Sequence, residues 1–384
     1  MATESSTARA PGGPASLAPH AACEEGLFLA PALRARVDAY LEPRAAAIDA
    51  AAPGEAAARD SLAFLNDELA RVPGASVATP NVDLVRVAET IATAAACDMS
   101  TAFSLWCHRM VLEYLSQAPD GSPLRRKEVP ALIGTRLFGS TALAAAMAYH
   151  VSGAALPVQW RREGRELVLD GQIRWASNLF PPGSITVTAA APTDHRDGAP
   201  LVVAIPTGTP GFAIQPYPRL LALQATGSSS VALRGVRVPE EAIVAQDFTA
   251  FITRVRPAFL LLQSSFCLGL AQRALAEAHA GLRGVAEIFL TDVEMLEQRY
   301  TELARLVRGA AANRGASQPI RQLVQARLDS AQLTTAAVAL EAKVAGGRGY
   351  VSTSGTVRRL REAAFLPVQA PTEGQLRWEL SRSA

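Results

Sequence analysis

The sequence predicts an α+β protein, mostly α, in which a small antiparallel β-barrel or sandwich separates an N-terminal helical domain from a C-terminal four-helix bundle. At 384 residues the chain is long for one hydrophobic core, so two or three packed units are expected. Apolar residues recur at three- and four-residue spacing towards both ends of the chain and at every second position between them. We expect a disordered tail at 1–25, a helical domain at 26–150, a β-domain at 151–248 and a helical bundle at 249–384.

The helical prediction for the first domain comes mainly from the run Val82 to Leu115, where apolar residues follow the helical period. The polar cluster that begins at Asp98 (Asp-Met-Ser-Thr) interrupts this run. Such a cluster is typical of one helix end followed by a new N-cap, so two consecutive helices are expected. The preceding tail contains mostly Ala, Ser, Pro and Gly and lacks the apolar stretch of a secretory signal.

The β-domain is predicted from short alternating segments that prolines and glycines separate every eight to twelve residues or so. In the segment REGRELVLDGQIRWA, Asp170-Gly171 predicts a two-residue hairpin turn, since both turn positions need positive φ. In the bundle, Pro257 suits the first turn of a helix. Val293, Tyr300, Leu303 and Val307 form one apolar stripe on the next helix, and a third helix should end at Gly346-Gly347.

Composition excludes several functional classes. The net charge is +2 and no basic run is present, which argues against nucleic-acid binding. No uninterrupted apolar stretch is long enough to predict a membrane span. The four cysteines form no CxxC pair and the five histidines are scattered, so we expect reduced thiols, no metal site and a cytoplasmic protein.

Several motifs, in this order and spacing, resemble the acyl-CoA dehydrogenase family over roughly residues 26–380. They are CDMSTAFSLWCHRMVLEYL, GRELVLDGQIRWASN, VALRGVRVPEEAIV, GLAQRALAEA, and AGGRGY with RRLREAAF and TEGQ. The resemblance implies FAD as the cofactor, bound at a site shared between subunits of a homodimer or homotetramer. It also implies an acyl thioester as the substrate, on coenzyme A or an acyl-carrier protein, and leaves the electron acceptor open.

The resemblance places Glu373, in Pro-Thr-Glu-Gly-Gln, at the position of the family's catalytic base, which removes the α-proton while flavin N5 accepts the β-hydride. We expect the pKa of this carboxyl to be raised by an apolar cleft. No Asp or Glu occurs from Phe248 to Ala276, where a minority of the family carries the base. The adjoining Gly374 is a candidate for substrate binding.

The resemblance also implies cofactor contacts. Trp175, Ser177 and Asn178 match the hairpin that packs beside the flavin, with the hydroxyl directed towards N5. Gly346 and Gly347 match a glycine pair that approaches the dinucleotide, although a helix C-cap explains them almost as well.

Three departures from the family pattern weaken the cofactor prediction. In the flavin loop before the hairpin only Ser152 or Gly153 can play a comparable part. The segment that contacts the FAD diphosphate has no clear match, and Gln-Leu-Arg follows Glu373-Gly374. Arg256, a candidate for substrate binding, lies four residues out of register, which is about one helical turn.

Two alternatives stay open. A flavin-dependent monooxygenase on the same fold would not need the glutamate. An FAD-less, non-enzymatic homologue would be compatible with the altered flavin loop.

Overall fold

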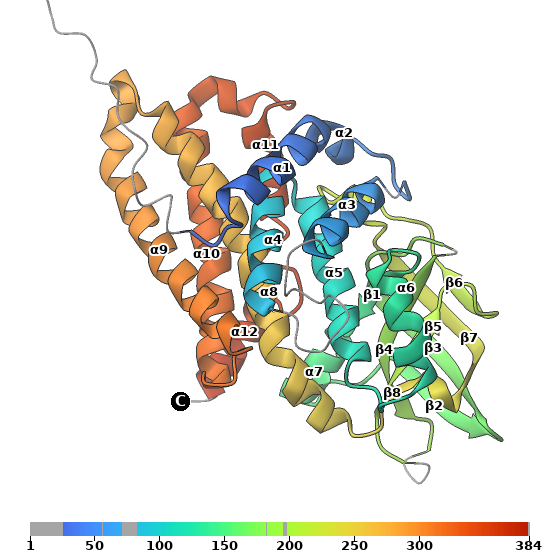
Figure 1. Ribbon diagram of the computed structural model, residues 1–384. Helices are drawn as coiled ribbons and strands as arrows, with labels where there is room; N and C mark the ends of the chain where they lie inside the picture. Colours follow the sequence, from blue (N-terminus) through green and yellow to red (C-terminus); the bar gives the residue numbers. More distant parts are fainter. Residues whose placement is uncertain (1–25, 56, 71–82, 182, 195–197, 383–384) are drawn as a thin grey trace, which may run out of the picture.

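The computed structural model describes residues 26–55, 57–70, 83–181, 183–194 and 198–382; the tail predicted at 1–25 lies outside them. Figure 1 shows a β-sheet at one side, a bundle of long helices at the other, and α4 and α5 between them. This arrangement confirms the predicted α+β class. The N-terminal helices are α1 (Pro31–Leu41), α2 (Ala45–Asp49), α3 (Ala58–Ala70), α4 (Leu84–Cys97), α5 (Met99–Leu115) and α6 (Val129–Ile133).

The predicted break at Asp98 is confirmed. Asp98 ends α4 in an extended conformation, and its carboxylate accepts hydrogen bonds from the backbone N–H groups of Ser100 and Thr101. These bonds satisfy two of the free donors at the start of α5. Every residue of α5 is buried, because the helix lies between the bundle and the sheet.

The sheet is mixed, whereas the sequence predicted an antiparallel one. Its order is β6-β7-β3-β2-β4-β5-β8, and β1 pairs with β4 in parallel, as β2 also does. β1 comes from the region that was predicted to be helical. The strands are β1 (Phe138–Ala142), β2 (Val158–Glu163), β3 (Glu166–Ala176), β4 (Ser184–Pro192), β5 (Leu201–Pro206), β6 (Phe212–Ile214), β7 (Ser229–Pro239) and β8 (Ile243–Ala245), and α7 (Ala144–Ser152) follows β1.

The hairpin predicted at Asp170-Gly171 is wrong. β3 runs through both residues, and the register with β7 shifts between Leu169 and Gly171. Asp170 accepts hydrogen bonds from Gly235 N–H and from Arg161, which holds this irregular point in the sheet. Gly171 has a φ of 132°, and a Cβ there would lie 2.2 Å from the Pro157 carbonyl oxygen. The glycine therefore marks a bulge with close backbone approach.

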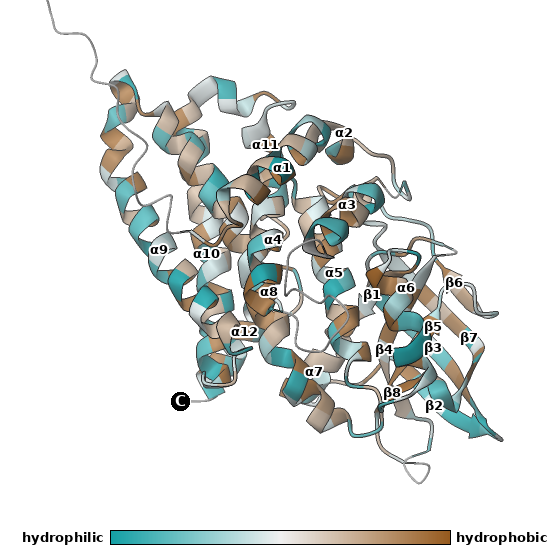
Figure 2. Cartoon of the chain, viewed as in Figure 1, coloured by the Kyte–Doolittle hydropathy of each residue, from teal (hydrophilic) through white to brown (hydrophobic). Residues whose placement is uncertain are grey.

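The long helices of the bundle are amphipathic as predicted. Val293, Tyr300, Leu303 and Val307 are all buried on one side of α9, and Figure 2 shows hydrophilic residues on the same helix at the outer edge of the molecule. The third predicted helix ends before Gly346, as expected. The helices of this part are α8 (Phe248–Gly281), α9 (Leu290–Ala312), α10 (Ile320–Ala345), α11 (Gly355–Ala363) and α12 (Glu373–Arg382), with short 3₁₀ turns at Gly284–Phe289 and Gly346–Tyr350.

The predicted start of the first bundle helix at Pro257 is wrong. α8 begins at Phe248, capped by the Asp247 side chain, and Pro257 lies inside it. A proline in a helix interior costs a backbone hydrogen bond. Here the helix continues because α8 packs along both α10 and α4, so that tertiary packing overrides the local signal.

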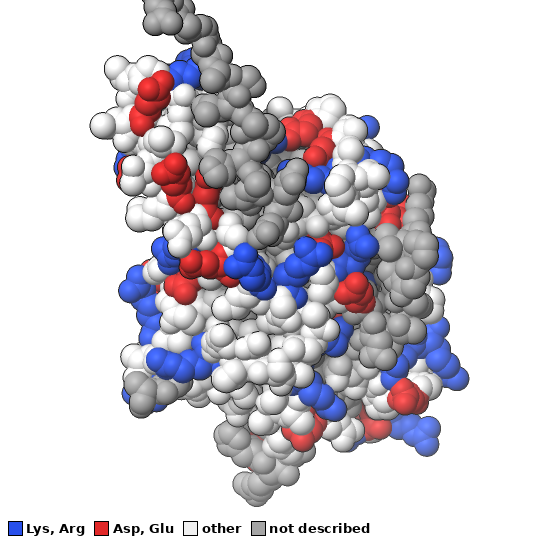
Figure 3. All heavy atoms as spheres, turned by 60° about the vertical axis from the view of Figure 1, so that its left-hand side comes forward, with Lys and Arg blue, Asp and Glu red and all other residues white. Residues whose placement is uncertain are grey.

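α8 is long and apolar enough to cross a membrane by length and composition alone, but 94% of its most apolar window is buried inside the protein. A core helix passes the same test, so this finding is weak evidence for a membrane. Three of the four cysteines, Cys97, Cys107 and Cys267, lie among the described residues and are buried free thiols, as predicted. On the face shown in Figure 3, acidic and basic side chains are interspersed.

Candidate functional site

Among the described residues, one cavity lies where α5, the end of β3, α8 and the segment after α11 meet, and it is larger than a second one beside α12. Its volume is about 510 Å³, within the usual range for small-molecule sites. Its lining residues come from segments that are far apart in the sequence, so the cavity depends on how the sheet packs against the helices. The lining residues are Phe103, Trp106, Thr141, Leu143, Ala144, Trp175, Ala176, Ser177, Leu220, Leu221, Ala222, Leu223, Thr226, Ser228, Phe259, Arg361, Ala364, Phe365, Val368, Gln369 and Ala370.

Exposed apolar side chains lie around this cavity. Trp175 on β3 is 55% exposed, Leu221 is 65% exposed and Val368 is 67% exposed, although all three line the cavity. Three large apolar groups from separate segments, exposed around one hollow, are typical of a surface that a ligand covers. The indole of Trp175 provides a flat face for a planar ring system.

A chain of hydroxyl groups runs along one wall of the cavity. Ser177 Oγ lies 2.7 Å from Ser228 Oγ, which lies 2.7 Å from Thr226 Oγ1, and Thr226 donates to the Leu223 carbonyl oxygen at 2.7 Å. A hydroxyl has only one hydrogen to donate. Since Thr226 uses its hydrogen on Leu223, Ser228 must donate to Thr226, and Ser177 must donate to Ser228. Ser177 therefore presents lone pairs, and no free hydrogen, to a ligand.

The interior end of the cavity is aromatic. Trp106 stacks on Phe103 with ring centroids 5.3 Å apart and meets Phe259 edge-on at 5.0 Å. Phe365 packs edge-on against Phe103 at 4.9 Å. No Asp or Glu belongs to the described lining, and its charged residue is Arg361, which is held by Asp49 and by the Leu221 carbonyl oxygen.

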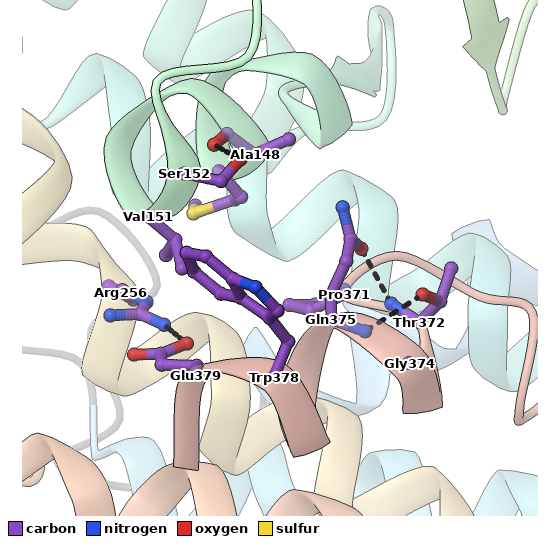
Figure 4. Close-up of a pocket in the computed structure, with 11 residues that line it drawn as sticks. Ala148, Val151, Ser152, Arg256, Pro371, Thr372, Gly374, Gln375, Trp378 and Glu379 are labelled. Atoms are coloured by element: carbon purple, nitrogen blue, oxygen red, sulfur yellow. Dashed lines mark hydrogen bonds and ion pairs between the residues drawn. The ribbon is translucent and has the colours of Figure 1, made fainter. Parts of the chain in front are cut away.

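The smaller cavity, of about 410 Å³, lies between α7, α8 and α12. It brings together three residues that the sequence proposed separately, Ser152, Arg256 and Gly374. Figure 4 shows Trp378 between α7 and the α12 backbone, with the partly buried Arg256–Glu379 ion pair beside it. The Ser152 hydroxyl donates to the Ala148 carbonyl oxygen, within its own helix. The lining residues are Met147, Ala148, Val151, Ser152, Arg256, Pro371, Thr372, Gly374, Gln375, Trp378 and Glu379.

Glu373, the predicted base, lines neither cavity. It is the first residue of α12, and its Oε1 accepts hydrogen bonds from Arg377 Nε at 2.8 Å and from Gln332 Nε2 at 3.4 Å. The hydrogen bond from Arg377 holds the pKa of the Glu373 carboxyl below its ordinary value. The expectation of a raised pKa is therefore wrong, because the carboxylate is partly exposed and ion-paired instead of being desolvated.

The remaining predicted cofactor residues lie outside both cavities. The Asn178 side chain is buried and donates to the carbonyl oxygens of Ser104 and Gly139, so it joins α5 to β1. Gly346 is exposed, has a φ of 58° and caps the C-terminus of α10, and the exposed Gly347 follows it. Their roles towards a cofactor stay predictions.

Sequence reasoning missed three residues around the larger cavity that the structure makes prominent. Thr226 and Ser228 orient the Ser177 hydroxyl, and Gln369 contributes an amide to the lining. The run Gly-Ser-Ser-Ser at 227–230 is the one sequence signal for the hydroxyl chain, and it is indistinguishable from a polar loop.

Comparisons with known proteins point to one fold. No protein-family model matches the chain. A Bacillus subtilis (strain 168) protein described as "Probable acyl-CoA dehydrogenase YngJ" is 24% identical over 235 residues, which are 57% of this chain and 61% of that protein. The chain thus spans about three fifths of the length of this curated relative.

Among solved structures, a glutaryl-coenzyme A dehydrogenase in complex with glutaryl-CoA aligns with a TM-score of 0.80 and 16% identity, over 91% of this chain and 92% of that one. A nitroalkane oxidase variant crystallised with 1-nitrohexane aligns with a TM-score of 0.78 and 15% identity, over 92% and 95%. At such identities the likeness shows the fold alone, and proteins with this fold are named for more than one activity.

Proposed function

We propose that this chain, which has the acyl-CoA dehydrogenase fold and is a divergent relative of those proteins in sequence, is an FAD-dependent oxidoreductase that acts on an acyl thioester. The observation that carries the proposal is the larger cavity, where an exposed Trp175 and an oriented Ser177 hydroxyl stand on one wall. The curated relatives that match the chain are described as acyl-CoA dehydrogenases, which supports the substrate class.

The residues of the larger cavity fit a flavin ring. Trp175 supplies a flat apolar face, Ser177 supplies a hydrogen-bond acceptor, and the rim leaves apolar surface to be covered. When bound there, FAD would supply an acceptor for two electrons as a hydride. The aromatic interior formed by Trp106, Phe103 and Phe259 is suited to the acyl part of the substrate and excludes water from it.

Dehydrogenation between the α and β carbons is the form of this proposal that the sequence relatives support. It needs a base for the α-proton, and Glu373 is the residue proposed for that role. In this structure its carboxylate is bonded to Arg377 and Gln332, so the role requires Glu373 to leave these partners and turn towards the substrate.

The second candidate is a flavin-dependent monooxygenase. One observation favours it: the described lining of the larger cavity contains no carboxylate. A reaction of reduced flavin with oxygen needs a dry cavity and does not need a carboxylate base from the protein.

The substrate's carrier is proposed to be coenzyme A or an acyl-carrier protein, and the protein is proposed to form a homodimer or homotetramer. Sharing of the cofactor between subunits would account for the position of Gly346 and Gly347 outside the cavity.

The test is spectroscopic. Purified protein is expected to be yellow or to become so with FAD, and to be bleached by an acyl-CoA in the absence of oxygen. Protein that takes up FAD, is not bleached by any acyl-CoA, and consumes oxygen after chemical reduction in the presence of substrate would support the second candidate. A colourless protein that takes up no FAD would overturn both.

A further inference from the structure

Arg327 on α10 is a buried cation without an acidic partner. The side chain is 0% exposed, and no carboxylate of the described residues forms an ion pair with it. Its guanidinium donates instead to Gln263 Oε1 at 3.1 Å, to Gln369 Oε1 at 2.9 Å and to the Leu366 carbonyl oxygen at 3.2 Å. Burying an unpaired charge is costly, so a purely structural role is better served by a neutral residue.

The chemistry of Arg327 fixes how two glutamine side chains are oriented. A guanidinium is only a donor, so the atoms that face it in Gln263 and Gln369 must be the amide oxygens. Both NH₂ groups then point the other way. Each donates to the Ala370 carbonyl oxygen, at 2.9 Å from Gln263 and 2.8 Å from Gln369.

One hydrogen on the Gln369 amide has no acceptor among the residues that the structure describes. Its Nε2 carries two hydrogens, and the hydrogen bond to Ala370 accounts for one of them. Gln369 lines the larger cavity, while Arg327 and Gln263 do not. Because the Gln369 oxygen accepts from a charged donor, its amide is polarised and its remaining N–H is a stronger donor than that of a free glutamine.

We propose that Gln369 donates a hydrogen bond to a carbonyl oxygen of the ligand held in the larger cavity, and that Arg327 is the positioning residue that fixes this donor. The inference rests on the proposed function, which supplies two ligands with such an oxygen, the acyl thioester and the flavin ring. A donor directed at a carbonyl oxygen on which negative charge develops would stabilise that charge. The proposal makes the Gln369 amide a hydrogen-bond donor, which an ionised carboxylate could not be.

The experiment uses Gln369→Glu, which has the same shape but presents an acceptor in place of the donor. The full-length parent and variant are loaded with FAD, and binding of butyryl-coenzyme A labelled with ¹³C at its carbonyl is followed by calorimetry and infrared spectroscopy. We expect butyryl-coenzyme A to bind at least about tenfold more weakly to the variant, as loss of one hydrogen bond to a polarised donor implies. The carbonyl stretch of bound ligand, lowered in the parent, should return towards its value in solution.

The two affinity measurements distinguish whether the carbonyl oxygen belongs to the thioester or to the flavin. If the acceptor is the thioester, FAD affinity is unchanged and butyryl-coenzyme A affinity falls; if it is the flavin, FAD affinity itself falls by a similar factor. Gln322→Glu, on the exposed start of α10, controls for the added charge. Gln369→Met, which has no donor, replaces the first variant if that one does not fold.

Arg327→Met tests the positioning role, since the Gln369 amide is then free to reverse, and Arg327→Lys should restore part of the lowered carbonyl stretch. Unchanged affinities and an unchanged carbonyl stretch in Gln369→Glu would overturn the inference alone. A parent that binds neither FAD nor butyryl-coenzyme A overturns the proposed function and the inference together.

Discussion

The two cavities are built from neighbouring parts of the chain and differ in their chemistry. Ala370 lines the larger cavity and Pro371 the smaller one, so adjacent residues belong to different sites. The larger cavity has aromatic walls, a hydroxyl chain, the Gln369 amide and an Arg361 that is paired with Asp49, whereas the smaller one contains the Arg256–Glu379 ion pair. The larger cavity is thus suited to a neutral, planar group and the smaller one to a polar segment of a ligand.

This difference bears directly on Glu373. Its neighbours in the chain, Thr372 and Gly374, line the smaller cavity, but its own carboxylate faces Gln332 and Arg377. A base that acts on a substrate in the larger cavity must lie at that cavity. The position of Glu373 therefore distinguishes dehydrogenation, which needs this base, from the monooxygenase reaction, which does not.

The largest effect is expected for Glu373→Gln. Under the dehydrogenation proposal, the rate of flavin reduction by an acyl-CoA falls at least about a hundredfold, since a positioned base contributes about 10²–10⁴ in rate. FAD content and substrate binding should stay as in the parent, because the amide keeps the shape of the side chain. Anaerobic stopped-flow reduction measures this, and a parent-like rate would remove Glu373 as the base and favour the monooxygenase.

The next effect compares one tryptophan in each cavity. Trp175→Ala should weaken FAD binding by about ten- to a hundredfold, because about 1.5–3 kcal/mol comes from covering a large apolar side chain. Its exposure makes the fold insensitive to the change. Trp378→Ala in the smaller cavity is the matched control and should keep FAD. Fluorescence titration with FAD gives both values, and equal losses would mean that the flavin does not lie on Trp175.

The predictions that succeeded rest on signals that are local in the sequence. The apolar stripe of α9 and the cap at Asp98 follow from helical spacing and from a short polar side chain beside free N–H groups. The predictions that failed involve contacts between distant residues. Asp170-Gly171 is not a turn because Gly235 and Arg161 bind the Asp170 side chain from β7 and β2.

The site shows the same limit. Trp175 and Ser177 were predicted because one short motif, at the end of β3 and just after it, resembles the family's hairpin, and the structure places both on one cavity. Arg327 and Gln369 are 42 residues apart and meet only when α10 packs on the segment after α11. No pattern within either segment indicates that contact, so pairwise geometry was needed to recognise it.

A third prediction asks whether Glu362, which follows the cavity-lining Arg361, is protonated in the folded protein. Glu362 on α11 accepts from Met99 N–H, and burial raises the pKa of its carboxyl to about 8, with Arg358 opposing the shift and Asp98 adding to it. Between about pH 4.5 and 8 the folded protein keeps a proton that the unfolded chain releases, so stability falls as the pH rises through this window.

Glu362→Gln removes this titration and can still accept from Met99. Relative to the variant, the free energy of unfolding of the parent should therefore fall by on the order of 1–3 kcal/mol between pH 5 and pH 8.5. Urea unfolding of both proteins across that range is the measurement. Parallel profiles would show that Glu362 is ionised in the folded state.

The smallest effect concerns the hydroxyl chain of the larger cavity, in which each hydroxyl donates its one hydrogen to the next group. Ser177 donates to Ser228, so towards a bound flavin it can only accept. Ser177→Ala removes that acceptor, to which the N5–H of a reduced flavin could donate, and should slow flavin reduction by an amount equivalent to about 0.5–1.5 kcal/mol, with little change in the free energy of unfolding. Ser228→Ala instead leaves the hydroxyl at position 177 and releases its hydrogen for donation to N5 of oxidised flavin. If the chain orients Ser177 as deduced, the two variants must differ: Ser228→Ala should hold oxidised FAD more tightly than the parent, while Ser177→Ala should not. Equal effects of both variants on FAD affinity and on the rate of reduction would mean that the hydroxyls serve only a structural role, and the flavin contact assigned to Ser177 would then be lost.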